Sequence, residues 1–142
     1  MPVRTAHAVW DGTLKDGKGS FEVESGAVHG AFSFGTRFEE EPGSNPEELI
    51  GAAHAGCFSM ALSGDLGKAG YTPLSVHTTA RVHIEKGDAG FGITAIDLES
   101  EARAEGLDDA EFQRIAEGTR QNCPVSKALA SVPIALKAVL LP

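Results

Sequence analysis

The chain has 142 residues, a formal net charge of −8, 42% hydrophobic residues and 23% charged residues. This balance is typical of a soluble globular protein and excludes a disordered chain, which would be poorer in apolar residues. The acidic charge argues against nucleic acid as a partner, because general nucleic-acid binding needs a basic surface that displaces counterions from phosphates. No repeat, low-complexity tract or linker interrupts the chain, so we expect a single domain over residues 1–142.

Two cysteines are too few for the disulfide framework of a small secreted protein. Residues 1–11 lack the apolar core of a signal peptide. The longest run without charged residues, Leu49–Gly64, is shorter than the roughly 18 residues that a transmembrane helix requires. We therefore expect a cytoplasmic protein with no membrane partner, in which both cysteines rest as thiols.

The N-terminal part of the chain predicts extended structure. Residues 5–10 and 19–25 have the composition of two strands, and the turn-forming residues 11–18 lie between them. Residues 31–40 are also expected to be extended.

A long helix is predicted over residues 46–68. Ser44 or Asn45 can cap its first turn, and Pro46 suits the first helical position because its missing N–H would have no partner there. Gly70 is a typical residue just beyond a helix end.

The C-terminal half predicts two long strands, two helices and a last strand. Residues 74–85 and 96–103 alternate between apolar and polar side chains, which indicates antiparallel strands with one buried face. Helices are expected over 108–122 and 124–130, and a closing strand over 131–141. Strands grouped around central helices indicate an α+β fold.

Cys57 lies in the middle of the predicted helix 46–68. At about 100° per residue, small and apolar residues share its face: Ile50, Ala53, Met60, Ala61 and Gly64. We therefore expect the Cys57 thiol to point inward. A free cysteine in such a place is often just a small buried hydrophobe, so a purely structural interpretation stays open beside a chemical one.

Cys123 precedes a predicted helix whose first residue is Pro124. Unpaired N–H groups at a helix start stabilise a thiolate, which favours redox chemistry, although a cysteine can also serve there only as a cap. The two cysteines are 66 positions apart, which excludes a Cys-x-x-Cys motif but allows the thiols to meet in space. Peroxide reduction uses such a pair, because a second thiol condenses with the sulfenic acid formed by the first.

A thiolate in an apolar pocket needs a nearby cation, because burial alone raises the pKa of a thiol. Arg37 is the nearest upstream candidate. The helix geometry places Glu47 at the border of the groove that contains Cys57, where it can hold an arginine, whereas Glu48 should face solvent. The alternative is that each of these residues is a solvated surface charge.

Four segments follow one another in the order and spacing of one known family: Phe34–Phe38, Asn45–Leu62, Ala89–Thr94 and Asn122–Leu129. Together they resemble the osmotically inducible protein C and organic hydroperoxide resistance family (OsmC/Ohr). The resemblance runs over nearly the whole chain, and the helix segment around Cys57 is its most specific piece. The position of Arg37 resembles the OsmC branch, because the corresponding arginine of the Ohr branch lies nearer the N-terminus.

This resemblance implies an α+β fold in which antiparallel sheets wrap around central helices, in an intertwined homodimer with active sites at the dimer interface. It implies a thiol-dependent peroxidase that reduces organic hydroperoxides in oxidative and osmotic stress defence. Some members of the family also reduce hydrogen peroxide. It further implies a dithiol reductant and no metal, haem or flavin cofactor.

The resemblance also implies roles for four residues of this chain. Cys57 matches the peroxidatic cysteine and Cys123 the resolving cysteine. Arg37 matches the arginine that holds the thiolate, and Glu47 the glutamate that orients this arginine. We expect Phe58 and Met60, or groups across the dimer, to form the apolar surroundings of Cys57, which would favour an alkyl hydroperoxide.

Three other functions remain as alternatives. The first is a metal site, because His54 and Cys57 share a helix face, as two metal ligands can. The chain can instead be a non-enzymatic, oligomeric ligand-binding module whose cysteines only pack. Acyl transfer by Cys57 and His54 would need a carboxylate that orients the histidine.

Overall fold

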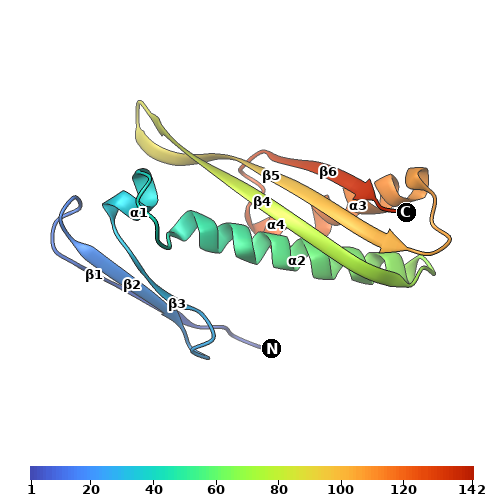
Figure 1. The fold of residues 1–142 in the computed structure, drawn as a ribbon, viewed down its shortest axis with the longest axis horizontal. Coiled ribbons are helices and arrows are strands. Elements are labelled where there is room, and N and C mark those ends of the chain that lie inside the picture. Colours follow the sequence, from blue (N-terminus) through green and yellow to red (C-terminus); the bar gives the residue numbers. More distant parts are fainter. The chain divides into compact units, whose positions relative to one another are not determined.

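The computed structural model describes residues 1–142 and divides them into two units. The N-terminal unit is Met1–Leu49 and the C-terminal unit is Ile50–Pro142. The elements of both are labelled in Figure 1. That the whole chain forms one domain stays a prediction, and each unit is described by itself.

The N-terminal unit contains a three-stranded antiparallel sheet in the order β1-β2-β3. Its strands are β1 (Ala6–Asp11), β2 (Lys18–Val23) and β3 (His29–Phe32). The first two strands agree with the prediction, with bounds shifted by one or two residues. Phe32 stacks on Phe21 with a centroid distance of 5.2 Å and contacts Trp10 at 5.4 Å, so aromatic rings cover one face of the sheet.

The expectation of extended structure over residues 31–40 holds for residues 31–32, which end β3, and is wrong for residues 34–38. Helix α1 (Phe34–Phe38) forms there because Ser33 and Thr36 make a reciprocal cap. The Thr36 N–H donates to Ser33 Oγ at 3.2 Å, and the Ser33 N–H donates to Thr36 Oγ1 at 2.8 Å. The cap puts Arg37 in the last turn of this helix.

Helix α2 (Pro46–Lys68) has the predicted bounds. Of the two candidate caps, Asn45 is the one used, because its Oδ1 accepts the Glu48 N–H at 2.8 Å. Ser44 instead donates to the carbonyl oxygen of Ala31. Gly70 ends the helix with a φ of 93°, a left-handed conformation that glycine adopts without steric cost.

The buried stripe of α2 differs from the predicted one. Its buried side chains recur every four residues at His54, Phe58, Leu62 and Leu66. Met60, expected on the inner face, is 81% exposed. Many of the residues around Cys57 are alanine or glycine, so the two faces of the helix differ little in hydrophobicity. The sequence therefore did not identify which face is buried.

Strands β4 (Pro73–Gly87) and β5 (Gly90–Ala104) form the predicted antiparallel hairpin. The predicted inner face of β5 is confirmed, because its residues at 96, 98, 100 and 102 are all buried. On β4 the alternation holds from Val76 onward. Leu74 is 63% exposed, since a register shift between Pro73 and Ser75 turns it out of the expected face.

Two helices lead from β5 to the last strand. They are α3 (Asp109–Asn122) and α4 (Pro124–Ala128), and β6 (Ile134–Leu140) follows them. Strand β6 pairs with β5 in parallel, so the sheet of this unit is mixed in the order β4-β5-β6.

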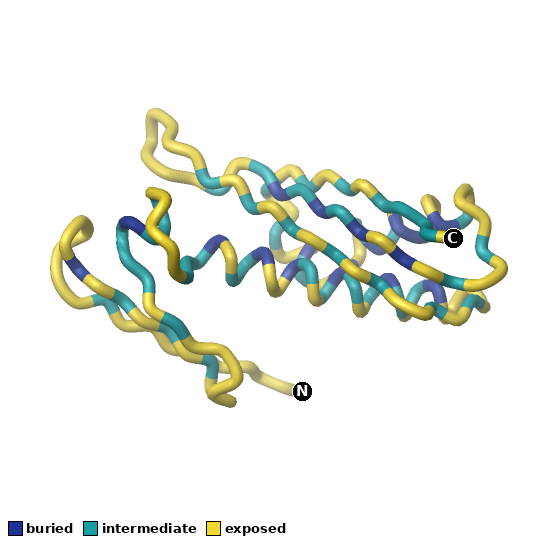
Figure 2. Tube along the Cα trace, viewed as in Figure 1, coloured by how far each residue is buried: buried dark blue, intermediate teal, exposed yellow.

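The core of the C-terminal unit gathers residues from α2, β5 and α3 (Figure 2). Its largest fully buried side chains are Phe58, Phe112, Leu62 and Leu66. Cys123 belongs to the same core, and Cys57 packs against it. No helix is long and apolar enough to cross a membrane.

Candidate active site

Cys57 and Cys123, which we call the thiol pair, lie together in the C-terminal unit. Cys57 is half-buried on α2, whereas Cys123 is only 1% exposed. Both are free thiols, and Cys57 lies close enough to Cys123 for the neighbouring thiol to raise its pKa. The fold thus brings together two cysteines that are far apart in the sequence.

Cys123 occupies the junction between α3 and α4. Its backbone N–H donates to the carbonyl oxygen of Thr119 at 2.9 Å, which closes α3. Its sulfur accepts the Ser126 N–H at 3.4 Å, which caps α4. The expected position at a helix start is therefore observed, and a backbone donor points at the sulfur.

Cys57 experiences opposing effects on its acidity. Burial raises the pKa of the Cys57 thiol, and the neighbouring Cys123 raises it further. The backbone N–H of Val125 hydrogen-bonds the Cys57 sulfur and lowers the pKa, but by less. The net effect of these contacts is a raised pKa, so a reactive Cys57 thiolate needs an additional positive charge.

His54 and Ser126 extend the thiol pair through a hydrogen-bond chain that was not predicted. Ser126 Oγ lies 3.3 Å from Cys123 Sγ and 2.7 Å from Nε2 of the fully buried His54. Burial lowers the pKa of the His54 imidazole. His54 and Ser126 are 72 positions apart, so no local sequence signal could have paired them.

Arg37 and Glu47, which we call the ion pair, lie together in the N-terminal unit. Arg37 Nη2 is 2.8 Å from Glu47 Oε1, and Arg37 Nε is 3.2 Å from both carboxylate oxygens. Glu47 is buried, whereas 37% of the Arg37 side chain is exposed. The guanidinium also lies over the ring of Phe38, 5.1 Å from its centroid. Glu47 thus holds the arginine as predicted from helix geometry, and Glu48 is exposed.

The structure therefore contains two pairs of predicted site residues, one in each unit. The contact that would join them, from Arg37 to the Cys57 thiolate, stays a prediction. Among the apolar residues expected around Cys57, Phe58 is fully buried in the core. The expectation for Met60 is wrong within this chain, because its side chain points outward from α2.

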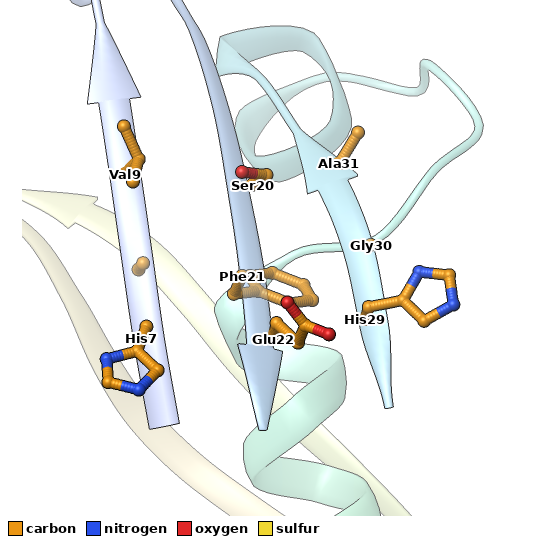
Figure 3. A pocket seen from close by; sticks show the side chains of 9 residues that line it. His7, Val9, Ser20, Phe21, Glu22, His29, Gly30 and Ala31 are labelled. Carbon is orange, nitrogen blue, oxygen red and sulfur yellow. The ribbon is translucent and has the colours of Figure 1, made fainter. Parts of the chain in front are cut away.

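Two other kinds of site can be compared with the thiol pair and the ion pair, a metal-binding cluster and a pocket. No group of three or more His, Cys, Asp or Glu side chains is placed to hold a metal ion. A shallow depression on the N-terminal sheet is lined by residues of all three strands, including His7, Glu22 and His29 (Figure 3). It contains none of the predicted site residues.

Comparison with known proteins identifies relatives along most of the chain. The family model described as OsmC-like protein matches residues 38–137. The chain is 52% identical over 127 residues to peroxiredoxin OsmC of Escherichia coli (strain K12), which covers 89% of each chain. It is 33% identical over 87 residues to the organic hydroperoxide resistance protein of Xanthomonas axonopodis pv. citri, covering 61% of this chain and 59% of the relative.

Solved structures support the fold independently of sequence. The crystal structure of an organic hydroperoxide resistance protein OsmC from Legionella pneumophila superposes with a TM-score of 0.70 at 21% identity, over 100% of both chains. At this identity the likeness concerns the fold alone, and it agrees with the predicted α+β class. The family model over residues 38–137 and the 52% identical relative show that this chain belongs to the OsmC-like protein family.

Proposed function

We propose that the thiol pair carries out the reduction of organic hydroperoxides, with the ion pair supplying the positive charge that Cys57 needs. Its relatives indicate that the chain is a thiol-dependent peroxidase. One of them is named a peroxiredoxin and is 52% identical to this chain, with 89% of each chain covered. The observation that carries the assignment of residues is the contact between the Cys57 and Cys123 side chains. A disulfide-forming peroxidase requires such a contact.

The proposed reaction begins at Cys57. Its thiolate attacks one peroxide oxygen, the O–O bond breaks, and the alkoxide leaves as an alcohol after protonation. Cys57 becomes a sulfenic acid. Condensation with the Cys123 thiol then forms the Cys57–Cys123 disulfide and releases water, and a cellular dithiol reduces the disulfide to complete the cycle.

Arg37 is proposed to stabilise the Cys57 thiolate and the polarised O–O bond. A guanidinium fixed beforehand by a buried carboxylate loses little freedom when the substrate arrives, which is the basis of electrostatic preorganisation. Its contacts with Glu47 support this role, because two nitrogens of the fork are held and the remaining donors stay available.

Organic hydroperoxides are the proposed substrate class, with hydrogen peroxide as a second substrate. The named activity of one relative, organic hydroperoxide resistance, supports this choice. The half-buried position of Cys57 against an apolar core supports it as well, because an alkyl group gains contacts there that hydrogen peroxide cannot make.

We also propose that the protein acts in the cytoplasm as a homodimer and that residues 1–142 form one domain. The outward face of α2 supports a second copy of the chain as its partner. This face is exposed and consists mainly of small residues, namely Ala52, Ala53, Gly56, Met60, Gly64 and Gly67. Small residues allow two helices to approach closely.

A peroxidase assay with cumene hydroperoxide and a dithiol tests this function. Cys57→Ser should abolish turnover, because no thiolate remains to attack the peroxide. With the dithiol left out, Cys123→Ser should still have Cys57 oxidised by the hydroperoxide but form no intramolecular disulfide. Ala61→Ser is the matched control, since it places the same side chain in a half-buried position of the same helix and should leave turnover intact. Undiminished turnover in Cys57→Ser would overturn the assignment of Cys57, whereas a lack of turnover in the unmodified protein would favour a binding module with structural cysteines.

A further inference from the structure

His54 is a buried titratable residue that the proposed peroxidase reaction does not use. Its side chain is fully buried on α2, and its Nε2 lies 2.7 Å from Ser126 Oγ. Its other ring nitrogen, Nδ1, is buried with no hydrogen-bond partner. An unpaired polar atom of this kind costs about 1–3 kcal/mol, so a role in packing alone does not account for a histidine here.

Ser126 connects this histidine to the thiol pair. Cys123 Sγ donates to Ser126 Oγ at 3.3 Å, and the Ser126 hydroxyl in turn faces His54 Nε2. All three side chains are nearly or fully buried, with exposures of 1% for Cys123, 3% for Ser126 and 0% for His54. A proton that leaves Cys123 therefore has a continuous path of hydrogen bonds to the imidazole and little direct access to water.

We propose that Ser126 and His54 form a relay that accepts the proton of Cys123 when Cys123 condenses with the sulfenic acid of Cys57. Ser126 touches the reacting sulfur and is a catalytic residue in this step, whereas His54 acts through Ser126 and is a positioning residue. The inference rests on the proposed function, because it concerns the formation of the Cys57–Cys123 disulfide.

The step balances in atoms and charge. The Cys123 S–H proton passes to Ser126 Oγ while the Ser126 hydroxyl proton passes to His54 Nε2, which leaves a thiolate and an imidazolium. The thiolate attacks the Cys57 sulfur, the S–S bond forms, and the S–O bond of the sulfenic acid breaks. The departing hydroxide takes up one proton and leaves as water, and the imidazolium returns to its neutral form.

The surroundings of His54 suit a proton acceptor. The titratable groups that face the relay are Cys57 from α2 and Cys123 from the start of α4. Asp65, farther along α2, is bound by the Thr119 hydroxyl of α3 at 2.7 Å.

On the packed sheet, Arg81 of β4 pairs with Glu99 of β5, and His83 of β4 pairs with Asp97 of β5, both in solvent-accessible positions. Burial lowers the pKa of His54, so the imidazole is neutral and able to accept a proton at neutral pH.

The relay can be tested in a single turnover, with one equivalent of cumene hydroperoxide added to the reduced protein. Loss of hydroperoxide reports the oxidation of Cys57, and non-reducing mass spectrometry reports formation of the disulfide. Ser126→Ala and His54→Gln should leave the oxidation rate unchanged and slow disulfide formation by about tenfold or more at neutral pH. Glutamine can still hydrogen-bond Ser126, but it cannot take a proton.

The pH profile separates proton transfer from a merely structural role. In the unmodified protein the rate of disulfide formation should fall at acidic pH, where His54 is protonated, and level off once His54 is neutral. In His54→Gln the rate should instead keep rising with hydroxide concentration through the neutral range. A profile of unchanged shape in His54→Gln, with or without a lower rate, would overturn the relay.

Ser100→Ala is the matched control for Ser126→Ala. Ser100 is equally buried, in the same unit, and bonds only to the Thr78 hydroxyl at 3.0 Å. It should alter stability without altering the rate of disulfide formation. If the unmodified protein formed no disulfide with hydroperoxide, the proposed function itself would fail, whereas normal disulfide formation in both Ser126→Ala and His54→Gln would contradict the relay alone.

Discussion

At the scale of single residues, the acidity of Cys57 is the quantity on which the proposed chemistry depends. Burial and the neighbouring Cys123 raise the pKa of its thiol, and only the Val125 N–H opposes them. A raised pKa keeps the sulfur protonated at neutral pH, and a protonated sulfur is a poor nucleophile. A guanidinium held by a buried carboxylate is the type of group that reverses this balance.

Replacing Arg37 by methionine should therefore slow the oxidation of Cys57 by about tenfold or more at neutral pH. The oxidation rate rises with pH as the thiolate forms, so loss of the cation should move this rise to higher pH. The measurement is the pH dependence of hydroperoxide consumption in a single turnover.

Arg81→Met provides the matched control for Arg37→Met. Arg81 is also paired with a glutamate, Glu99, but its side chain is 58% exposed on β4. Its loss should leave both the rate and the pH profile unchanged. An unshifted profile in Arg37→Met would mean that this arginine does not act on the Cys57 thiolate.

The individual site residues differ in how far the sequence alone could place them. The burial of Glu47 and the exposure of Glu48 follow from the angle between successive residues of a helix. The pairing of His54 with Ser126 does not, because it depends on how α4 packs against α2. A local pattern carries no information about such a long-range contact.

At the scale of elements, two glycines with different backbone conformations allow a paired test of helix stability. Gly70 ends α2 with a φ of 93°, so Gly70→Ala should lower the free energy of unfolding by about 1–2 kcal/mol. Gly118 lies inside α3 with no atom within 4 Å of an added Cβ, so Gly118→Ala should raise it by about 0.5–1 kcal/mol. Urea unfolding measures both, and equal effects of the two substitutions would contradict these backbone assignments.

Elements with a strong periodic signal were predictable, and those defined by a few polar contacts were not. The alternation along β4 and β5 identified both strands and the buried face of β5. Helix α1 was missed because it is only five residues long and depends on the reciprocal cap of Ser33 and Thr36. A short helix with such a cap differs little in free energy from extended structure. The composition of this segment also suits a strand, so the sequence alone does not show which one forms.

At the scale of the whole molecule, the expectation of one domain predicts a single unfolding transition. Trp10 is the only tryptophan, and it packs on Phe32 in the N-terminal unit, so its fluorescence reports that unit. Far-ultraviolet ellipticity is dominated by the helices, most of whose residues belong to the C-terminal unit. The two signals should change at the same urea concentration. Two separate midpoints would mean that the units unfold independently.

The family and the α+β class were predictable from sequence, because several segments match in order along the chain. The parallel pairing of β6 with β5 was not. Leu136 lies beside Leu98 only after α3 and α4 have returned the chain to the edge of the sheet. The periodicity of side chains within β6 does not indicate whether β6 runs parallel or antiparallel to β5.

The separation of the thiol pair along the chain has a consequence for protein synthesis. Cys57 leaves the ribosome 66 residues before Cys123, and the junction that holds Cys123 exists only after α3 and α4 have formed. In the proposed mechanism, a nascent chain thus exposes an oxidisable sulfur with no second thiol to condense with. A Cys57 sulfur that peroxide does oxidise during translation can pass beyond the sulfenic acid to the irreversible sulfinic acid, because no resolving thiol is yet in place.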